Sequence, residues 1–287
     1  MIPEAIRYVR PDTIEAAVEV FEQSRGKGTF LAGGTDLVLE MKRGSAKPDV
    51  LIDVARLREL SVLEEKNGYL YLGAALSFSR IASSALVRRF APALAAAAED
   101  IGSPQIRARG TMGGNIATGS PAGDSLPALV AHDAEIVTEG VNGAAISSLE
   151  SFLGKKSAGG NRGVLIREVR IPALPGGQVK GTFVKLGRRN ALAIARISAA
   201  LVIKGEAEGA MKKISLVLGA VGRQPLRVPL LEPSGSDFNA LAAAAAELAE
   251  QAVAKSIPGR PTAPYKMRAV KGVVLEAFER VRNGGYG

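Results

Sequence analysis

The stretch Leu31-Ala32-Gly33-Gly34-Thr35-Asp36-Leu37 ends a short apolar run in two glycines, and residues 37–42, which are compatible with a helix, follow it. Glycine lets the backbone turn tightly and lets an anion approach successive N–H groups, which together form a concave anion site. A helix that begins after such a turn adds the positive end of its dipole. Thr35 offers a hydroxyl that can donate to a phosphate oxygen. The stretch therefore predicts a phosphate-binding loop.

A second glycine pair lies in Thr111-Met112-Gly113-Gly114-Asn115, inside a long polar segment that continues to Pro127. Such a glycine-rich stretch in an apolar chain is typical of a binding loop or a lid. One glycine pair alone is more often a plain turn, and that interpretation stays open for both pairs. Two such loops would suit a ligand with two linked phosphates, such as a dinucleotide, although spacing alone allows any phosphate-bearing molecule. Neither loop matches the Rossmann or P-loop pattern.

The segments around these loops alternate between helical and extended patterns. Thr13 stands at the N-cap of a helix predicted over residues 14–23, where apolar residues have helical spacing. Further helices are predicted from Ser77 or Ser79 and over 88–101, 127–131, 238–254 and 264–282. Strands are predicted over 29–32, 50–53, 69–74, 135–138, 164–171, 180–185, 197–203 and 214–220. Residues 172–178, rich in proline and glycine, are the best linker candidate. The order after them, three strands and then two helices, indicates an α+β fold.

Composition narrows the function further. The 287 residues are 47% hydrophobic and 23% charged, which is typical of a globular chain. There is no cysteine, so the chain itself cannot hold a cysteine-ligated iron–sulfur cluster. The single histidine, His132, argues against a histidine-rich metal site, and we expect it to have a structural or a surface role. No acid–base pair is evident, so no catalytic acid or base and no metal site is predicted.

The net charge of +9 favours an acidic protein partner or an anionic ligand. The basic residues are scattered and only 5% of residues are aromatic, which argues against nucleic acid. Arg107 and Arg109, beside the second loop, suit a phosphate, a partner subunit or plain solvent equally well. The first residues lack the pattern of a signal peptide, and no apolar run approaches the roughly 18 residues that span a bilayer. A cytoplasmic protein without a membrane span is expected.

The paired loops resemble the FAD diphosphate loops in the flavin subunits of molybdenum hydroxylases, a family that includes xanthine dehydrogenases and bacterial carbon monoxide dehydrogenase. The resemblance extends from Ile2-Pro3 through residues 124–129 to residues 185–189 and covers essentially the whole chain. It implies an α+β fold with a two-lobed FAD-binding domain of the vanillyl-alcohol-oxidase or PCMH type at residues 1–176, whose lobes span about 1–55 and 56–176. A small α+β C-terminal domain at 177–287 follows, with a three-stranded antiparallel sheet plus helices.

The resemblance also implies which positions contact the cofactor. Two backbone segments would hold the diphosphate from opposite sides, two isoleucines would make apolar contacts, an aspartate would accept from ligand hydroxyls, and a lysine would place a positive charge near the flavin. The implied set is Phe30, Leu31, Ala32, Gly33, Gly34, Thr35, Asp36, Leu37, Ile101, Thr111, Met112, Gly113, Gly114, Asn115, Asp124, Ile166 and Lys185.

Several of these positions also have a plainer interpretation. Ile101 and Ile166 suit a hydrophobic core equally well. Asp124 suits the N-cap of the helix that is predicted to begin near Pro127. Lys185 suits a solvated strand residue.

In this family a large subunit holds the molybdenum cofactor and oxidises the substrate, and a small subunit carries two [2Fe–2S] clusters. The resemblance implies that this chain binds FAD within such a heterotrimer, either single or dimerised, takes electrons from the clusters and passes them to an external acceptor. Thr35-Asp36 stands where the carbon monoxide dehydrogenase branch usually has His-Ser, which argues against carbon monoxide as the substrate. Residues 191–194, Ala-Leu-Ala-Ile, stand where that branch places an aromatic residue near the flavin, so the acceptor stays open. Two alternatives remain: a self-sufficient flavin-dependent oxidoreductase and a scaffold subunit without a cofactor.

Overall fold

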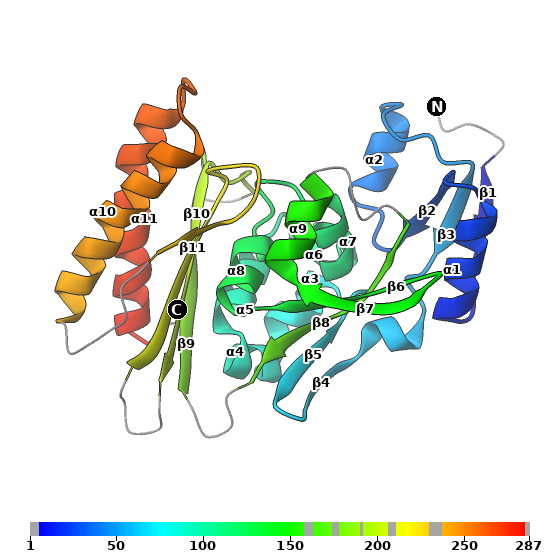
Figure 1. Ribbon diagram of the computed structural model, residues 1–287, viewed down its shortest axis with the longest axis horizontal. Helices are drawn as coiled ribbons and strands as arrows, with labels where there is room; N and C mark the ends of the chain where they lie inside the picture. The colour runs from blue at the N-terminus through cyan, green and yellow to red at the C-terminus, as the bar shows by residue number, and fades with distance from the viewer. Residues whose placement is uncertain are drawn as a thin grey trace.

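The computed structural model describes residues 6–157, 163–173, 178–189, 192–205, 211–229 and 237–284. They form three sheets with helices packed around and between them, an α+β arrangement (Figure 1). The strands are β1 (Arg7–Val9), β2 (Gly28–Leu31), β3 (Val50–Asp53), β4 (Leu63–Lys66), β5 (Tyr69–Gly73), β6 (Glu135–Gly140), β7 (Gly143–Ser148), β8 (Leu165–Pro172), β9 (Gln178–Leu186), β10 (Ile197–Gly205), β11 (Met211–Gly219) and β12 (Leu226–Val228). The helices are α1 (Ile14–Gln23), α2 (Leu37–Lys42), a 3-10 turn η1 (Arg58–Ser61), α3 (Phe78–Ser83), α4 (Ala85–Phe90), α5 (Pro92–Asp100), α6 (Pro104–Arg109), α7 (Met112–Thr118), α8 (Ser125–Ala131), α9 (Leu149–Ser157), α10 (Phe238–Ser256) and α11 (Ala263–Arg282).

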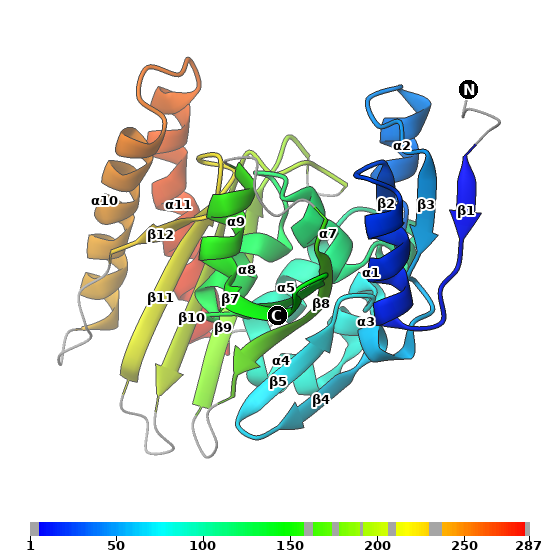
Figure 2. The same ribbon diagram turned by 45° about the vertical axis from the view of Figure 1, so that its right-hand side comes forward.

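The first lobe is a small parallel sheet with strand order β1-β3-β2, and Figure 2 shows β1 at the outer edge of the molecule. Helix α1 packs on it, because Ile14, Ala17 and Val18 lie on one helical face and are buried in a core shared with Ile52. The Thr13 hydroxyl caps the first turn as predicted, accepting from the N–H of Ala16. The glycine loop follows the carboxyl end of β2.

The second lobe is a five-stranded antiparallel sheet with strand order β4-β5-β8-β6-β7, joined by helices α3 to α9. The single helix predicted over 88–101 is wrong, because the chain breaks at Ala91 between α4 and α5. Pro92 lacks an N–H and crowds the residue before it, which leaves the helical region at φ −139° and ψ 57°. The break lets α5 turn into the centre of the core.

The C-terminal part is a four-stranded antiparallel sheet with strand order β12-β11-β10-β9. The expected sheet had three strands, but the short strand β12 pairs with β11 and adds a fourth. Alternate residues of β10 point to opposite faces: Ala200 and Val202 face the core with α5 and α8, whereas Ala199 and Leu201 face α10 and α11. Helices therefore cover both faces of this sheet (Figure 1).

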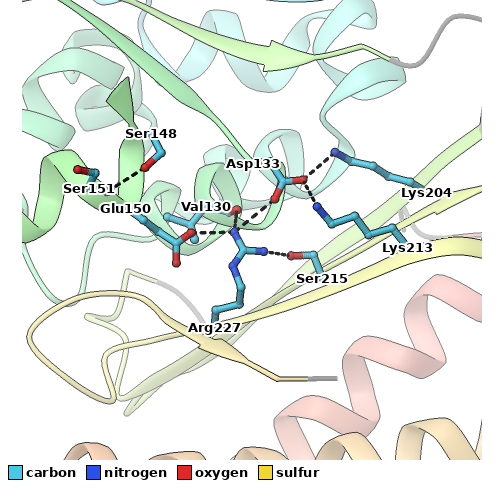
Figure 3. Close-up of polar contacts among 9 residues, drawn as sticks. All are labelled: Val130, Asp133, Ser148, Glu150, Ser151, Lys204, Lys213, Ser215 and Arg227. Carbon is cyan, nitrogen blue, oxygen red and sulfur yellow. Dashed lines mark hydrogen bonds and ion pairs between the residues drawn. The ribbon is translucent and has the colours of Figure 1, made fainter. Parts of the chain in front are cut away.

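A polar cluster joins the C-terminal sheet to the second lobe (Figure 3). The carboxylate of Asp133, just after α8, pairs with Lys204 at 3.1 Å, Lys213 at 2.9 Å and Arg227 at 3.4 Å. Arg227 also pairs with Glu150 of α9 at 3.0 Å. One carboxylate thus meets cations from β10, β11 and β12.

The linker predicted at residues 172–178 ends β8 and begins β9, and its residues 174–177 lie outside the described residues.

Candidate functional site: a cleft between two glycine loops

The two glycine loops line one cleft of about 510 Å³, within the size range of cofactor sites. The cleft contains all of residues 30–37 together with four of the other predicted positions, Ile101, Thr111, Gly114 and Asn115. Its other wall residues were not predicted as site residues. They include Phe78 and Ile106, which carry no local sequence signal, and Lys156, which comes from a distant helix.

Direct backbone contact holds the two segments together at Gly33. A Cβ atom at this position would lie 2.0 Å from the carbonyl oxygen of Arg109 and 3.1 Å from the Cα of Gly110. Only glycine permits this approach. A second link is side-chain based, since the Thr118 hydroxyl donates to the Asp36 carboxylate at 3.3 Å.

The first loop presents free backbone donors. Among the hydrogen bonds of the described residues, none is donated by the N–H groups of Gly33, Gly34, Thr35 or Asp36. Gly34 has φ +73°, a conformation that glycine adopts without strain and that turns the chain into α2. Polar N–H groups left without partners in a concave wall are suited to an anionic ligand.

The second segment differs from the predicted anion site, because its N–H groups already have partners. Met112 donates to Leu76 O at 3.0 Å and Gly113 to Ala74 O at 2.8 Å. Gly114 donates to the Thr111 hydroxyl, which caps α7, and a Cβ on Gly114 would meet only that hydroxyl. Gly114 has no side chain, so a ligand in the cleft can approach its backbone closely.

Asn115 adds a positioned side chain to this wall. The Ser125 hydroxyl donates to Asn115 Oδ1 at 2.7 Å and thereby fixes the amide. In the described part of the chain the amide nitrogen has no partner, so it remains available to donate.

A second, apolar cavity of about 90 Å³ lies behind the loops. Ile166 and Gly113 line it, together with Phe30, Ala32 and Gly114, which also face the main cleft. Ile166 is thus both a buried residue and a cavity wall. The structure places the remaining predicted residue of the second loop, Met112, in the hydrophobic core and not on the cleft.

Asp124 and Lys185 lie outside both cavities but contact each other. Lys185 Nζ donates to Asp124 Oδ2 at 2.8 Å and to the carbonyl of Asp100 at 2.5 Å. Lys185 is therefore not a solvated strand residue, and Asp124, although it precedes α8, makes no side-chain cap. The other oxygen, Oδ1, is buried and has no hydrogen-bond partner among the described residues.

Burial raises the pKa of the Asp124 carboxyl to about 6, although the Lys185 ammonium opposes this shift. A buried carboxylate oxygen without a partner is costly unless a ligand donor satisfies it. The pair lines neither cavity, so this unsatisfied oxygen is not part of the cleft wall in this structure.

The remaining candidate residues have structural contacts. Arg107 donates to the carbonyls of Ile101 and Gly102, whereas Arg109 contributes its backbone to the Gly33 contact and exposes its side chain. His132 is completely buried, and burial lowers its pKa to about 3. It does not line the cleft, and its burial excludes the surface role that the sequence left open.

These observations fit an extended dinucleotide. Free N–H donors and the exposed backbone of Gly114 suit its diphosphate, and the apolar cavity suits a ring. In the described residues, every helix is too short or too polar to span a lipid bilayer.

Comparisons with known proteins agree with this reading of the cleft. Residues 4–174 match the family model described as the FAD binding domain in molybdopterin dehydrogenase. The chain is 31% identical to the nicotinate dehydrogenase FAD-subunit of Eubacterium barkeri over 94% of both chains, and 28% identical to the glyceraldehyde dehydrogenase medium chain of Sulfolobus acidocaldarius over 98% of this chain and 100% of that one. It superimposes on a chain of carbon monoxide dehydrogenase from Hydrogenophaga pseudoflava that lacks the Mo-pyranopterin moiety of the molybdenum cofactor, with a TM-score of 0.87, 29% identity and 99% coverage of both chains.

The match spans well over half of the chain, and the residues that form the cleft lie within it. The chain therefore belongs to the FAD-binding subunits of the molybdenum hydroxylase family and is an oxidoreductase component.

Proposed function

We propose that this FAD subunit relays electrons from [2Fe–2S] clusters on a small partner subunit to an external acceptor, while a large partner subunit holds the molybdenum cofactor and oxidises the substrate. The absence of cysteine supports this division, because cysteine-ligated clusters must then lie on another chain. Bound FAD supplies the redox chemistry, since it exchanges electrons singly or in pairs.

The observation that carries the proposal is the set of free N–H groups at residues 33–36, which face a cleft closed by the second glycine segment. These donors would hold the diphosphate, and Gly114 would let it approach α7. The Asn115 amide would donate from the same side. Phe30, Ala32 and Ile166 would hold a ring in the apolar cavity.

Asp124 and Lys185 would complete the site from the side of the C-terminal sheet. Asp124 Oδ1 would accept a hydrogen bond from a ligand hydroxyl, which satisfies its missing partner. Lys185 is fixed by Asp124 and by the carbonyl of Asp100, so its positive charge is held in one place. A fixed cation favours the addition of electrons to a nearby group.

The proposal extends to the domain division. Residues 1–176 would form the FAD-binding domain, with lobes at about 1–55 and 56–176, and residues 177–287 the C-terminal domain. The support is that the parallel sheet ends with β3, the five-stranded sheet ends with β8, and the four-stranded sheet begins with β9.

Isolation of the native complex tests the function. A tagged form of this chain is expected to bring down two further subunits, with FAD, molybdenum and iron all present. An isolated FAD-loaded chain that oxidises a substrate by itself would instead show a self-sufficient oxidoreductase. A colourless chain that takes up no added FAD would show a scaffold.

A further inference from the structure

We propose that a second cavity beside the FAD cleft binds the phosphate group of a small organic molecule, which docks next to the cofactor. This inference rests on the proposed function, because it places the molecule beside bound FAD. The cavity measures about 220 Å³ and shares Thr118 and Lys156 with the main cleft. Its remaining walls come from Gly119 at the end of α7, from α8, from α9 and from the loop between β11 and β12.

Two cations meet in this cavity from parts of the sequence far from each other. Lys156 comes from α9, and Arg223 comes from the loop that follows β11. Within the described ranges neither side chain forms an ion pair or a hydrogen bond, in contrast to Arg227 on the next strand, which pairs with two carboxylates. Because both cations line one cavity and neither has an acidic partner among the described residues, the cavity suits an anion.

The backbone around this cavity is anchored. Ala220, at φ +60°, donates to Pro121 O at 2.9 Å, and its carbonyl accepts from Lys266 Nζ. The loop that carries Arg223 is therefore fixed at its start to both domains. On the opposite wall Lys156 lies against Gly119, because a Cβ there would be 2.8 Å from Lys156 Cε. The Lys156 side chain is thus packed against backbone, and the loop that carries Arg223 is anchored at Ala220, which lowers the cost of ordering the two cations around a ligand.

The donor set indicates a phosphate. The planar guanidinium of an arginine matches two phosphate oxygens at once, and the lysine ammonium adds a compact charge. Gln224 contributes an amide to the same wall, and Leu126 and Leu153 offer apolar surface for a short carbon chain. The cavity therefore suits a phosphate ester, with its phosphate between Lys156 and Arg223.

Phosphate binding by the FAD-loaded full-length chain tests this inference. Equilibrium dialysis with labelled inorganic phosphate and with labelled glycerol 3-phosphate would compare wild type with Arg223→Gln and Gln224→Glu. These two residues line the second cavity but neither the FAD cleft nor the apolar cavity behind it, so FAD affinity is expected to stay unchanged. Both variants are expected to weaken phosphate binding at least about tenfold, since one loses a charged donor and the other adds a negative charge. Arg58→Gln, an exposed arginine outside the cavities, is the matched control.

The outcomes separate the possibilities. Saturable phosphate binding that both variants lose, with the ester at least as tight as the inorganic ion, supports the site. No binding, equal binding by wild type and variants, or exclusion of the ester overturns it. If Arg223→Gln weakens FAD binding and FAD displaces phosphate, the cavity belongs to the cofactor's own diphosphate. In that case this inference fails while the proposed function stands.

Discussion

Replacing Gly33 by alanine probes the contact on which the cleft depends. The new Cβ would lie 2.0 Å from the carbonyl oxygen of Arg109 and 2.9 Å from its carbon, whereas real Cβ contacts stay beyond 3.0 Å. Both partners are backbone, so no side chain can rotate away. The two segments must separate by roughly 1 Å, judged from the 2.0 Å approach. Overpacking of this kind costs about 1–3 kcal/mol.

That cost falls on the geometry that would hold the diphosphate in the proposed site, so FAD should bind about five- to 150-fold more weakly, at about 1.4 kcal/mol per tenfold. Titration of the cofactor-free chain with FAD, followed by flavin fluorescence, measures the change. Gly272→Ala is the matched control: a Cβ there meets nothing within 4 Å, and alanine favours the helix α11. The reasoning is refuted if Gly33→Ala binds FAD within twofold of wild type.

Three further predictions concern charged residues. The pKa of Asp124 is about 6 in the folded chain and near 3.8 in the unfolded chain, so the folded state holds this proton more tightly. The free energy of unfolding of the FAD-free protein should therefore fall by up to about 3 kcal/mol as the pH rises from 3.8 to about 6. Thermal unfolding at several pH values measures this fall, and Asp124→Asn should flatten it. Asp133→Asn should lower the free energy of unfolding in urea by about 2 kcal/mol, because it leaves Lys204 buried without its partner. The control Asp49→Asn removes an exposed pair and should change that free energy by less than about 1 kcal/mol. Equal effects of the two variants would contradict the role given to the cluster. Lys185→Met should make the flavin midpoint potential more negative in spectroelectrochemical titration, because a nearby positive charge is lost, and an unchanged potential would place Lys185 away from the flavin.

The glycine loops were predictable because their chemistry is local. Gly33 and Gly34 end a strand, and a hydroxyl follows them, which indicates an anion site before any fold is known. The N-cap at Thr13 and the long strands and helices of the C-terminal part are local in the same sense. Their apolar spacing alone indicates the secondary structure.

The short strands β2 and β3 were predicted at 29–32 and 50–53, but β4 and β12 could not be predicted from such spacing. Residues 63–66, Leu-Glu-Glu-Lys, form β4 only because they pair with β5 across a turn at Asn67 and Gly68, both at positive φ. The Asn-Gly turn was a usable signal, since it favours a two-residue hairpin. Strand β12 has three residues, and its pairing with β11 decides its structure.

The sequence also did not show which of the two glycine segments has free N–H donors. Gly33 and Gly113 look alike in sequence, yet the N–H of Gly33 has no described partner, whereas that of Gly113 donates to Ala74 O. Which donors remain free depends on what packs behind each loop. Lys156 and Arg223 share a cavity only because the fold brings α9 beside the loop after β11.

The order in which the cofactor site is made follows from where its parts lie in the chain. A nascent chain that has emerged only as far as α2 displays the free donors of the first loop, but Gly33 has nothing to dock against until Arg109 and Gly110 have left the ribosome. Asp124 can pair with Lys185 only after β9, which carries Lys185, has been synthesised. In the proposed site, FAD would therefore bind fully only after Lys185 has been synthesised, and the yellow colour of the purified chain would report that both glycine segments have docked.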